Sequence, residues 1–176
     1  LLSKSLGLSS PTIKKQIDFL ENAFIVRLLE PYYFNISKRL VKSPKIFIRD
    51  TGLLHSLLEI DDMEHLFGNP VIGNSWEGYV IEQIYGVLPD GCTLNYYRTQ
   101  QGAELDLIIS RNLKPIAGIE IKFNSHPKIS IGNEISMNDL GLKHLYVVVP
   151  ETERYSLKPE IEVVSLNEIL GIVRSV

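Results

Sequence analysis

The stretch that decides the fold runs from Glu104 to Lys122 and reads Glu-Leu-Asp-Leu-Ile-Ile-Ser-Arg-Asn-Leu-Lys-Pro-Ile-Ala-Gly-Ile-Glu-Ile-Lys. Two short apolar runs each carry charged residues at alternating positions, a pattern typical of β-strands, whose successive side chains point to opposite faces. The polar turn around Asn112 is short enough to close a hairpin between the two strands. We therefore expect Asp106, Glu120 and Lys122 to meet on one surface of a sheet.

Charged residues inside these apolar strands indicate a function. Alternation predicts that Glu104, Asp106 and Ile108 share one face of the first strand, and that Glu120 and Lys122 share one face of the second. Moving charged groups out of water costs free energy, so packing alone rarely brings two carboxylates and an ammonium together. The three predicted neighbours are therefore candidates for a catalytic site.

This spacing resembles the signature of the PD-(D/E)xK nucleases, in which an Asp on one strand is followed by an acid-x-Lys on the next. The matching residues are Asp106, Glu120 and Lys122, while Leu105 stands where the family pattern has Pro. Members of the family often add a Glu from the preceding helix, and Glu77 is the candidate here. The other interpretation of Glu77 is an ordinary surface charge.

Phosphodiester hydrolysis requires charge to be stabilised on the attacking and leaving oxygens, which a divalent ion held by oxygen ligands does. Mg²⁺ binds through one or two carboxylates and keeps several waters, so Asp106 and Glu120 are the expected ligands of Mg²⁺ or Mn²⁺, with the carbonyl of Ile121 as a further ligand. Lys122 would stabilise the phosphate in the transition state, and Arg98 and Gln101 would contact the DNA backbone. The alternative is a buried ion-pair network in a nuclease fold that has lost its activity.

The net charge of −3 conceals a strong asymmetry along the chain. Residues 1–50, the head, carry nine Lys and Arg against four acids, whereas residues 51–176 carry nine against seventeen. A basic head joined to an acidic body indicates that a polyanion such as DNA meets the head first.

The head is predicted to be a winged helix-turn-helix. A short helix that ends at Gly7 precedes a helix capped by Ser10 that runs to about Asn22, and apolar runs over 24–29 and 45–49 predict two strands. The residues expected to contact DNA, in a groove or at phosphates, are Lys14, Lys15, Lys38, Arg39 and Lys42. The alternative for this head is a protein-docking module whose charges are merely solvated.

The remaining chain divides into a helical connector, 51–74, and a restriction-endonuclease-like domain, 75–176. Asn74 or Ser75 is the expected cap of a helix that starts at Trp76. The further expected elements are strands 93–98, 103–109, 115–123, 144–149 and 161–164 and helices 134–140 and 166–170. The fully apolar strand 144–149 is expected to lie parallel to a neighbour. The predicted fold class is therefore α/β with a mixed sheet.

A second resemblance covers essentially the whole chain and is most specific over Lys42-Ser-Pro-Lys-Ile-Phe-Ile-Arg-Asp-Thr-Gly-Leu53. The sequence is similar to the C-terminal half of bacterial and archaeal P-loop ATPases of the AAA+ type, in which an ATPase module precedes a winged helix and a nuclease-like domain of unknown function. The resemblance implies that ATP binds to an N-terminal ATPase module, which would be a partner of this chain. The motif Gly-x-x-x-x-Gly-Lys-Ser/Thr does not occur in this sequence, so we assign no nucleotide site to it.

No apolar run approaches the roughly 18 residues needed to span a bilayer, and no signal peptide is visible. The single cysteine, Cys92, has no partner for an internal disulfide and is expected to be a buried apolar residue. We therefore expect a cytoplasmic protein without a membrane partner.

Overall fold

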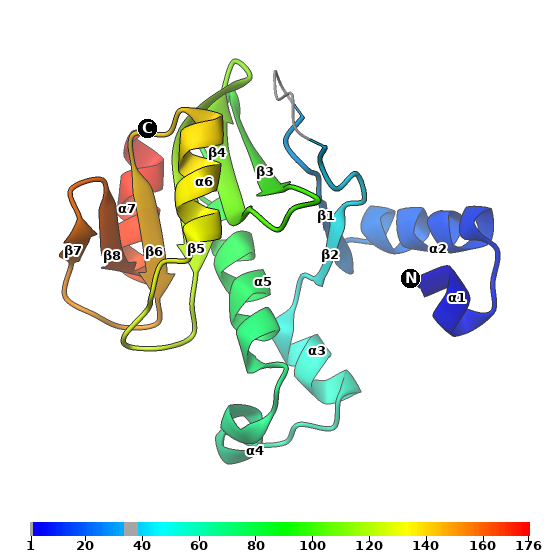
Figure 1. Cartoon of the computed structure of the whole chain (residues 1–176). Helices are drawn as coiled ribbons and strands as arrows, with labels where there is room; N and C mark the ends of the chain where they lie inside the picture. The colour runs from blue at the N-terminus through cyan, green and yellow to red at the C-terminus, as the bar shows by residue number, and fades with distance from the viewer. Residues whose placement is uncertain (1, 34–38) are drawn as a thin grey trace.

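The computed structural model describes residues 2–33 and 39–176. Over these residues the chain forms seven helices and eight strands (Figure 1). In chain order they are α1 (Leu2–Leu6), α2 (Ser10–Asn22), β1 (Val26–Leu29), β2 (Lys45–Ile48), α3 (Thr51–Leu57), α4 (Met63–Gly68), α5 (Ile72–Tyr85), β3 (Cys92–Arg98), β4 (Glu104–Arg111), β5 (Lys114–Ile121), α6 (Ile131–Leu140), β6 (Leu145–Val149), β7 (Tyr155–Lys158), β8 (Ile161–Ser165) and α7 (Leu166–Ser175).

Six of the strands form one mixed sheet in the order β3-β4-β5-β6-β8-β7. Strands β3, β4 and β5 are antiparallel, β6 lies parallel to both β5 and β8, and β7 closes the edge antiparallel to β8. The predicted class, α/β with a mixed sheet, is confirmed, as is a parallel neighbour for β6. Strand β7 was not predicted; it is only four residues long and all four are exposed.

Helices cover both faces of this sheet (Figure 1). On one face α5 and α7 contribute Val80, Ile81 and Val173 to an apolar cluster, and on the other face Met137 and Leu140 of α6 belong to a second cluster. Fully burying such a side chain contributes roughly 1.5–3 kcal/mol. Burial on both faces explains why the central strands are almost continuously apolar.

Side-chain caps fix the first residues of α6, which precedes β6 in the chain, and of α7, which follows β8. Ser130 and Asn133 form a reciprocal capping box at the start of α6, and Ser165 and Glu168 do the same for α7. Helix α6 therefore begins at Ile131 and not at the predicted residue 134. Gly141 ends it with a φ of 63°, a left-handed conformation that suits glycine.

Helix α5 begins at Ile72, ahead of the predicted start at Trp76. The expectation that Asn74 or Ser75 caps it is wrong, because both residues lie inside the helix. The Ser75 hydroxyl instead lies 2.7 Å from His55 Nε2 of α3, so this polar residue joins two helices.

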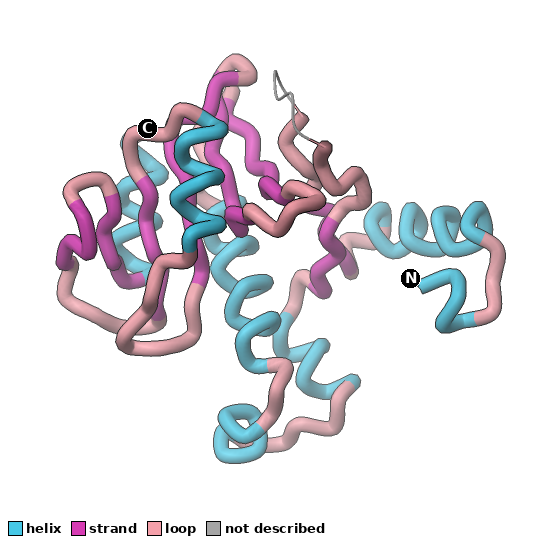
Figure 2. Tube along the Cα trace, in the orientation of Figure 1, coloured by secondary structure: helices cyan, strands magenta, loops and turns pink. Residues whose placement is uncertain are grey.

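The head consists of α1, α2 and the antiparallel pair β1–β2, and its two helices lie to one side of the large sheet (Figure 2). The cap of α2 is Ser9, one residue before the predicted Ser10. Ion pairs fasten the β1–β2 pair to α5, since Arg27 and Arg49 both contact the carboxylate of Glu82. Within the described ranges, no helix is long and apolar enough to cross a membrane.

Candidate active site between β4 and β5

The candidate site lies where two neighbouring strands separate. The pairing of β4 with β5 runs from Arg111 opposite Lys114 to Leu107 opposite Ile119, and it ends there. Strand β4 nevertheless continues along β3, through the pairs of Tyr97 with Leu105 and Arg98 with Glu104. The last residues of β5 and the first residues of β4 therefore diverge and leave a gap that side chains can enter.

A β-bulge in β4 sets the direction of the side chains at this gap. Asn95 of β3 pairs with Ile108 of β4, and Tyr97 pairs with Leu105. The two pairs are two residues apart on β3 but three residues apart on β4, so β4 contains one extra residue. As a result, Leu105 and Ile108 both pack in the cluster on the α6 side, and Leu107 packs on the α5 side. The bulge breaks the two-residue period on which the prediction of a face shared by Ile108 and Asp106 depends.

The carboxylates of Asp106 and Glu120 are both held by hydrogen bonds where β4 and β5 separate. Glu120 lies between Ile119 and Ile121, which pack on the α5 side, and its Oε2 accepts a hydrogen bond of 2.9 Å from Asn133 Nδ2 of α6. Asp106 Oδ2 accepts the backbone N–H of Ile121 at 2.9 Å, in place of the ladder bond that the separated strands no longer make. Both carboxylates are therefore held where the two strands separate.

Asn133 is a residue of the site that the sequence analysis missed. Its Nδ2 donates both to Glu120 and, at 3.0 Å, to the carbonyl of Glu104, so one amide bridges the two separated strands. Its Oδ1 accepts from Ser130 in the capping box. The pattern Ser130-x-x-Asn133 could have indicated the capping box of α6, but nothing in the sequence indicated that Asn133 joins Glu104 and Glu120.

Burial and crowding of negative charge change the protonation of Glu120. Residues Asp106 and Glu120 are 9% and 5% exposed. Burial, followed by the nearby charge of Asp106, raises the pKa of Glu120 to about 7. The Glu120 carboxyl therefore exchanges a proton near neutral pH.

Lys122 lies beside this carboxylate. Its Nζ is 2.6 Å from Glu120 Oε1, and its side chain is 37% exposed. Although burial opposes the change, the charges of Glu120, Asp106 and Glu77 raise the pKa of Lys122, so its ammonium stays charged. The structure thus brings Lys122, Glu120 and Asp106 into one electrostatic group.

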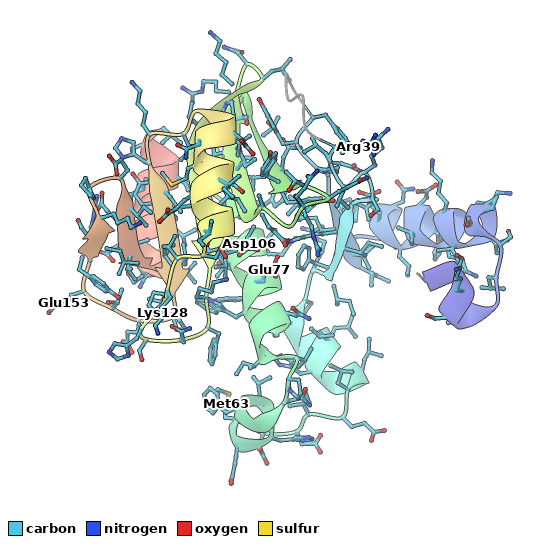
Figure 3. All side chains as sticks on the ribbon, in the orientation of Figure 1. Arg39, Met63, Glu77, Asp106, Lys128 and Glu153 are labelled. Atoms are coloured by element: carbon cyan, nitrogen blue, oxygen red, sulfur yellow. The ribbon has the colours of Figure 1, made fainter. Side chains whose placement is uncertain are left out.

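A second lysine, Lys45 of β2, enters the same group from the head and was not predicted. Its Nζ lies 2.9 Å from Glu77 Oε1, 3.1 Å from Glu104 Oε1 and 3.4 Å from Asp106 Oδ1. Figure 3 shows Asp106 and Glu77 close to one another. Glu77 is thus a partly buried, ion-paired member of the site rather than a free surface charge, and burial followed by the charge of Asp106 raises its pKa.

A cavity of about 580 Å³ opens beside these charges, between β2, α3 and α5. Lys45, Glu77 and Glu104 line it together with Arg98, whose Nε is 3.5 Å from Glu104 Oε2. Arg98, which the sequence analysis expected to contact a DNA phosphate, is half-exposed and lies next to the Glu104 carboxylate. Gln101 lies exposed in the turn after β3.

The residues predicted to bind DNA lie away from this gap. Lys14 and Lys15 are exposed on α2, and Arg39 and Lys42 are exposed in the connection that leads to β2. Figure 3 shows Arg39 on the head side, apart from Asp106. Lys38 lies outside the described residues.

The donor set suits a two-carboxylate metal site. In the part of the chain that the structure describes, no group of three or more His, Cys, Asp or Glu is arranged to hold a metal ion. Asp106 and Glu120 supply two carboxylates, which is the usual number for Mg²⁺ with several waters. The hydrogen bonds and ion pairs described above use one lone pair of each carboxylate oxygen, so each oxygen keeps a second one.

Comparison with known proteins gives matches of unknown function. Residues 1–64 match the family described as a domain of unknown function, DUF8612, and residues 72–169 match the domain of unknown function DUF4143. Two proteins, the uncharacterized protein Mb2031c of Mycobacterium bovis and the uncharacterized protein Rv2008c of Mycobacterium tuberculosis, are each 44% identical over 169 residues. The matches cover 96% of this chain and 38% of each relative, so the chain spans well under half of their length.

Among solved structures, a chain in the half-complex of Thermococcus gammatolerans McrB AAA+ hexamers with bound McrC is similar to 86% of this chain, and 59% of that chain is covered. The sequence identity is 7% and the TM-score is 0.40, a level of similarity from which neither fold nor function is inferred.

Proposed function

The chain belongs to the DUF4143 family of domains of unknown function, and from this premise we propose that it is a DNA-acting unit whose gap between β4 and β5 hydrolyses phosphodiester bonds with a divalent metal ion. The observation that carries the proposal is the meeting of Asp106, Glu120 and Lys122 at the point where two strands separate. Two buried carboxylates with an adjacent, partly exposed ammonium are the groups that this chemistry requires.

Within this proposal the large sheet with α5 and α6 is a restriction-endonuclease-like core, and the head is a winged helix. The order of elements supports this, since a helix, three antiparallel strands, a helix and a parallel strand follow one another from α5 to β6. The domain limits proposed are 1–50, 51–74 and 75–176.

A Mg²⁺ or Mn²⁺ ion held by Asp106 and Glu120 would supply charge to the reacting oxygens and lower the pKa of a water. The protein groups have separate tasks. The N–H of Ile121 fixes the Asp106 carboxylate, and the Asn133 amide fixes that of Glu120. Lys122 donates hydrogen bonds to a non-bridging oxygen of the phosphate, because its ammonium is charged and half-exposed.

The protonation of Glu120 sets the pH range of the proposed reaction. A carboxyl with a pKa of about 7 is half protonated at that pH, and a metal ligand must be ionised. Metal binding and cleavage are therefore both expected to increase as the pH rises through 7.

The proposal assigns DNA contact to the head. Lys14, Lys15, Arg39 and Lys42 are exposed, as phosphate contacts require, and Lys38 belongs to the same basic set. An N-terminal AAA+ module that binds ATP in the cytoplasm is the proposed partner, on the sequence resemblance described above.

A second candidate is a DNA- or protein-binding module without catalytic activity. One observation favours it: every oxygen of the Asp106 and Glu120 carboxylates has a partner within the chain, from Lys45, Ile121, Lys122 or Asn133. Such a network could simply join the parts of a fold.

Nicking of supercoiled plasmid by the chain in Mn²⁺ or Mg²⁺ distinguishes the two candidates. Catalysis predicts that Asp106→Ala and Lys122→Ala each abolish nicking while their circular dichroism spectra stay native. Lys128→Ala, which changes an exposed lysine six residues further along, is the matched control and should nick normally. Absence of ion-dependent nicking by the wild type, or nicking that persists in both variants, would contradict the proposed function.

A further inference from the structure

A cavity of about 300 Å³ lies at the other end of β4 from the candidate active site. Strands β3 and β4 contribute Thr93, Asn95 and Ser110 to its lining. Ser110 lies four residues beyond Asp106 in β4, roughly 13 Å further along the strand. The volume is at the lower limit of ligand pockets, so the cavity suits one ring-sized group and not a large molecule.

Ser110 gives this cavity a polar group that the fold does not use. Its side chain is 1% exposed, and within the described ranges its Oγ has no hydrogen-bond partner. Ser110 alternates with Ile108, which packs on the α6 side of the sheet, and it pairs with Thr93 of β3, which also lines the cavity. A buried hydroxyl without a partner is costly to a fold, and a ligand in the cavity would supply the missing partner.

Two tyrosines from the segment that follows β1 also line the cavity. This segment runs beside β3, where the N–H of Tyr32 donates to the carbonyl of Tyr96 at 2.8 Å (Figure 1). The hydroxyl of Tyr32 donates to the carbonyl of Leu113, and that of Tyr33 to the carbonyl of Lys42, both at 2.8 Å. Both rings are therefore held in place, and Tyr33, which is 48% exposed, offers an aromatic surface to a ligand.

Leu113 lines the cavity with a strained backbone. It is the second residue of the turn between β4 and β5 and has a φ of 63°, in the left-handed region that leucine rarely adopts. In such a turn Asn112 stands at a favoured position, but Leu113 stands where glycine is preferred. The Leu113 side chain is 59% exposed, so burial in the core does not explain it. A strained residue with an exposed apolar side chain at a cavity points to contact with a ligand.

The lining suits a neutral, flat ligand. All of the lining residues are uncharged, so the cavity favours an uncharged group. The ring of Tyr33 can stack on a flat ring, while the hydroxyl of Ser110 and the amide of Asn95 match the donors and acceptors on the edge of a nucleobase. Lys42, whose carbonyl holds Tyr33, is exposed and belongs to the set expected at DNA phosphates. A DNA strand held there would pass close to the cavity.

We propose that this cavity binds one unpaired nucleobase of a DNA strand, with Tyr33 stacked on the base and Ser110 hydrogen-bonded to its edge. The inference rests on the proposed function in that it takes DNA as the ligand of this chain. A base inside a duplex is paired and stacked, so only a locally unpaired base can enter the cavity. The chain would therefore prefer DNA with unpaired bases to an intact duplex.

NMR titration of the 176-residue chain with each of the four deoxynucleosides tests the cavity without any phosphate contact. At least one nucleoside, at millimolar concentration, should shift the backbone amide signals of Ser110 and Leu113. Tyr33→Ala should weaken this binding about fivefold or more, the loss that accompanies removal of a stacking partner. Tyr155→Ala is the matched control, because it removes a tyrosine of similar exposure from β7 and should bind as the wild type.

Two variants separate ligand contact from a structural role. Ser110→Ala removes a buried hydroxyl without a described partner, so it should not lower stability in urea unfolding but should weaken nucleoside binding. Leu113→Gly relieves the left-handed backbone, so it should be at least as stable as the wild type and should also bind less tightly. Variants that lose stability but bind nucleosides as the wild type does would overturn the proposal.

Anisotropy of a labelled single strand and of its abasic counterpart, which keeps the phosphates, identifies the source of the base. The strand with bases should bind more tightly, and Tyr33→Ala should remove the difference. Equal affinity for the two strands, or no nucleoside-induced shift at the cavity, would overturn the proposal. Base-dependent binding without plasmid nicking would refute the nuclease and leave the base site standing, whereas nicking without base-dependent binding would do the reverse.

Discussion

Glu120→Gln is expected to stabilise the protein at alkaline pH. Burial and the charge of Asp106 raise the pKa of Glu120 from its ordinary value of 4.5 to about 7. The folded state therefore holds a proton that the unfolded state releases, and stability falls as the pH rises from 4.5 through 7. The free energy lost across this window is about 3 kcal/mol, at about 1.4 kcal/mol for each pKa unit. A glutamine stays neutral and avoids this loss.

Urea unfolding, followed by tryptophan fluorescence at pH 5, 7 and 8.5, measures the effect through the single Trp76. Between pH 5 and 8.5, the unfolding free energy of the wild type should fall by up to about 3 kcal/mol more than that of Glu120→Gln. Most of this fall should occur between pH 4.5 and pH 7, the pKa values of Glu120 in the unfolded and folded states. Glu162→Gln on the exposed Arg154 pair is the control, because Arg154 lowers the pKa of Glu162 and no loss of stability is expected at alkaline pH. A difference between wild type and Glu120→Gln that does not vary with pH would refute the reasoning.

Three further predictions test the bridge, the core and the head. Asn133→Ala leaves the Glu104 carbonyl and Glu120 Oε2 without the Asn133 donor and should cost about 2–4 kcal/mol in urea unfolding, whereas the exposed Asn138→Ala should not. Gly118→Ala should lower the unfolding free energy by about 1–3 kcal/mol, because its Cβ would lie 2.9 Å from Leu142 Cδ1; Gly73→Ala, whose Cβ would meet no described atom within 4 Å, is the control. The double variant Lys14→Glu, Lys15→Glu should weaken duplex DNA binding in fluorescence anisotropy. It should also reduce the slope of log affinity against log salt concentration by about 2. The control is the double variant Lys114→Glu, Lys128→Glu, which makes the same charge change on the body. An unchanged salt slope in the head variant would exclude α2 from DNA contact.

Local sequence patterns predicted most of the fold. Alternating charges gave β4 and β5, and the unbroken apolar run gave β6 as a buried parallel strand. The spacing of apolar residues in a strand reflects which of its side chains are buried, and this spacing can be read from the sequence. Strand β7, the short segment Tyr155–Lys158, was missed although Tyr155 and Leu157 alternate with polar residues, because four exposed residues are too few to distinguish a strand from a loop; its backbone pairs with β8.

The site was less accessible to prediction, because its geometry depends on contacts between distant segments. The sequence indicated which charges gather where β4 and β5 separate, but the bulge in β4 arises in its pairing with β3, which no local pattern in β4 reports. Lys45 reaches Asp106 across 61 positions, and Asn133 reaches Glu104 across 29. No local period reports either contact.

The most direct test of the account is the position of a divalent ion in crystals of the chain grown with Mn²⁺ at pH 8. The account predicts an anomalous scattering peak between the carboxylates of Asp106 and Glu120, which is strongly reduced at pH 6 and absent from Asp106→Asn. Crystals that show no peak there at pH 8, with Glu120 still bound by Lys122 and Asn133, would contradict it.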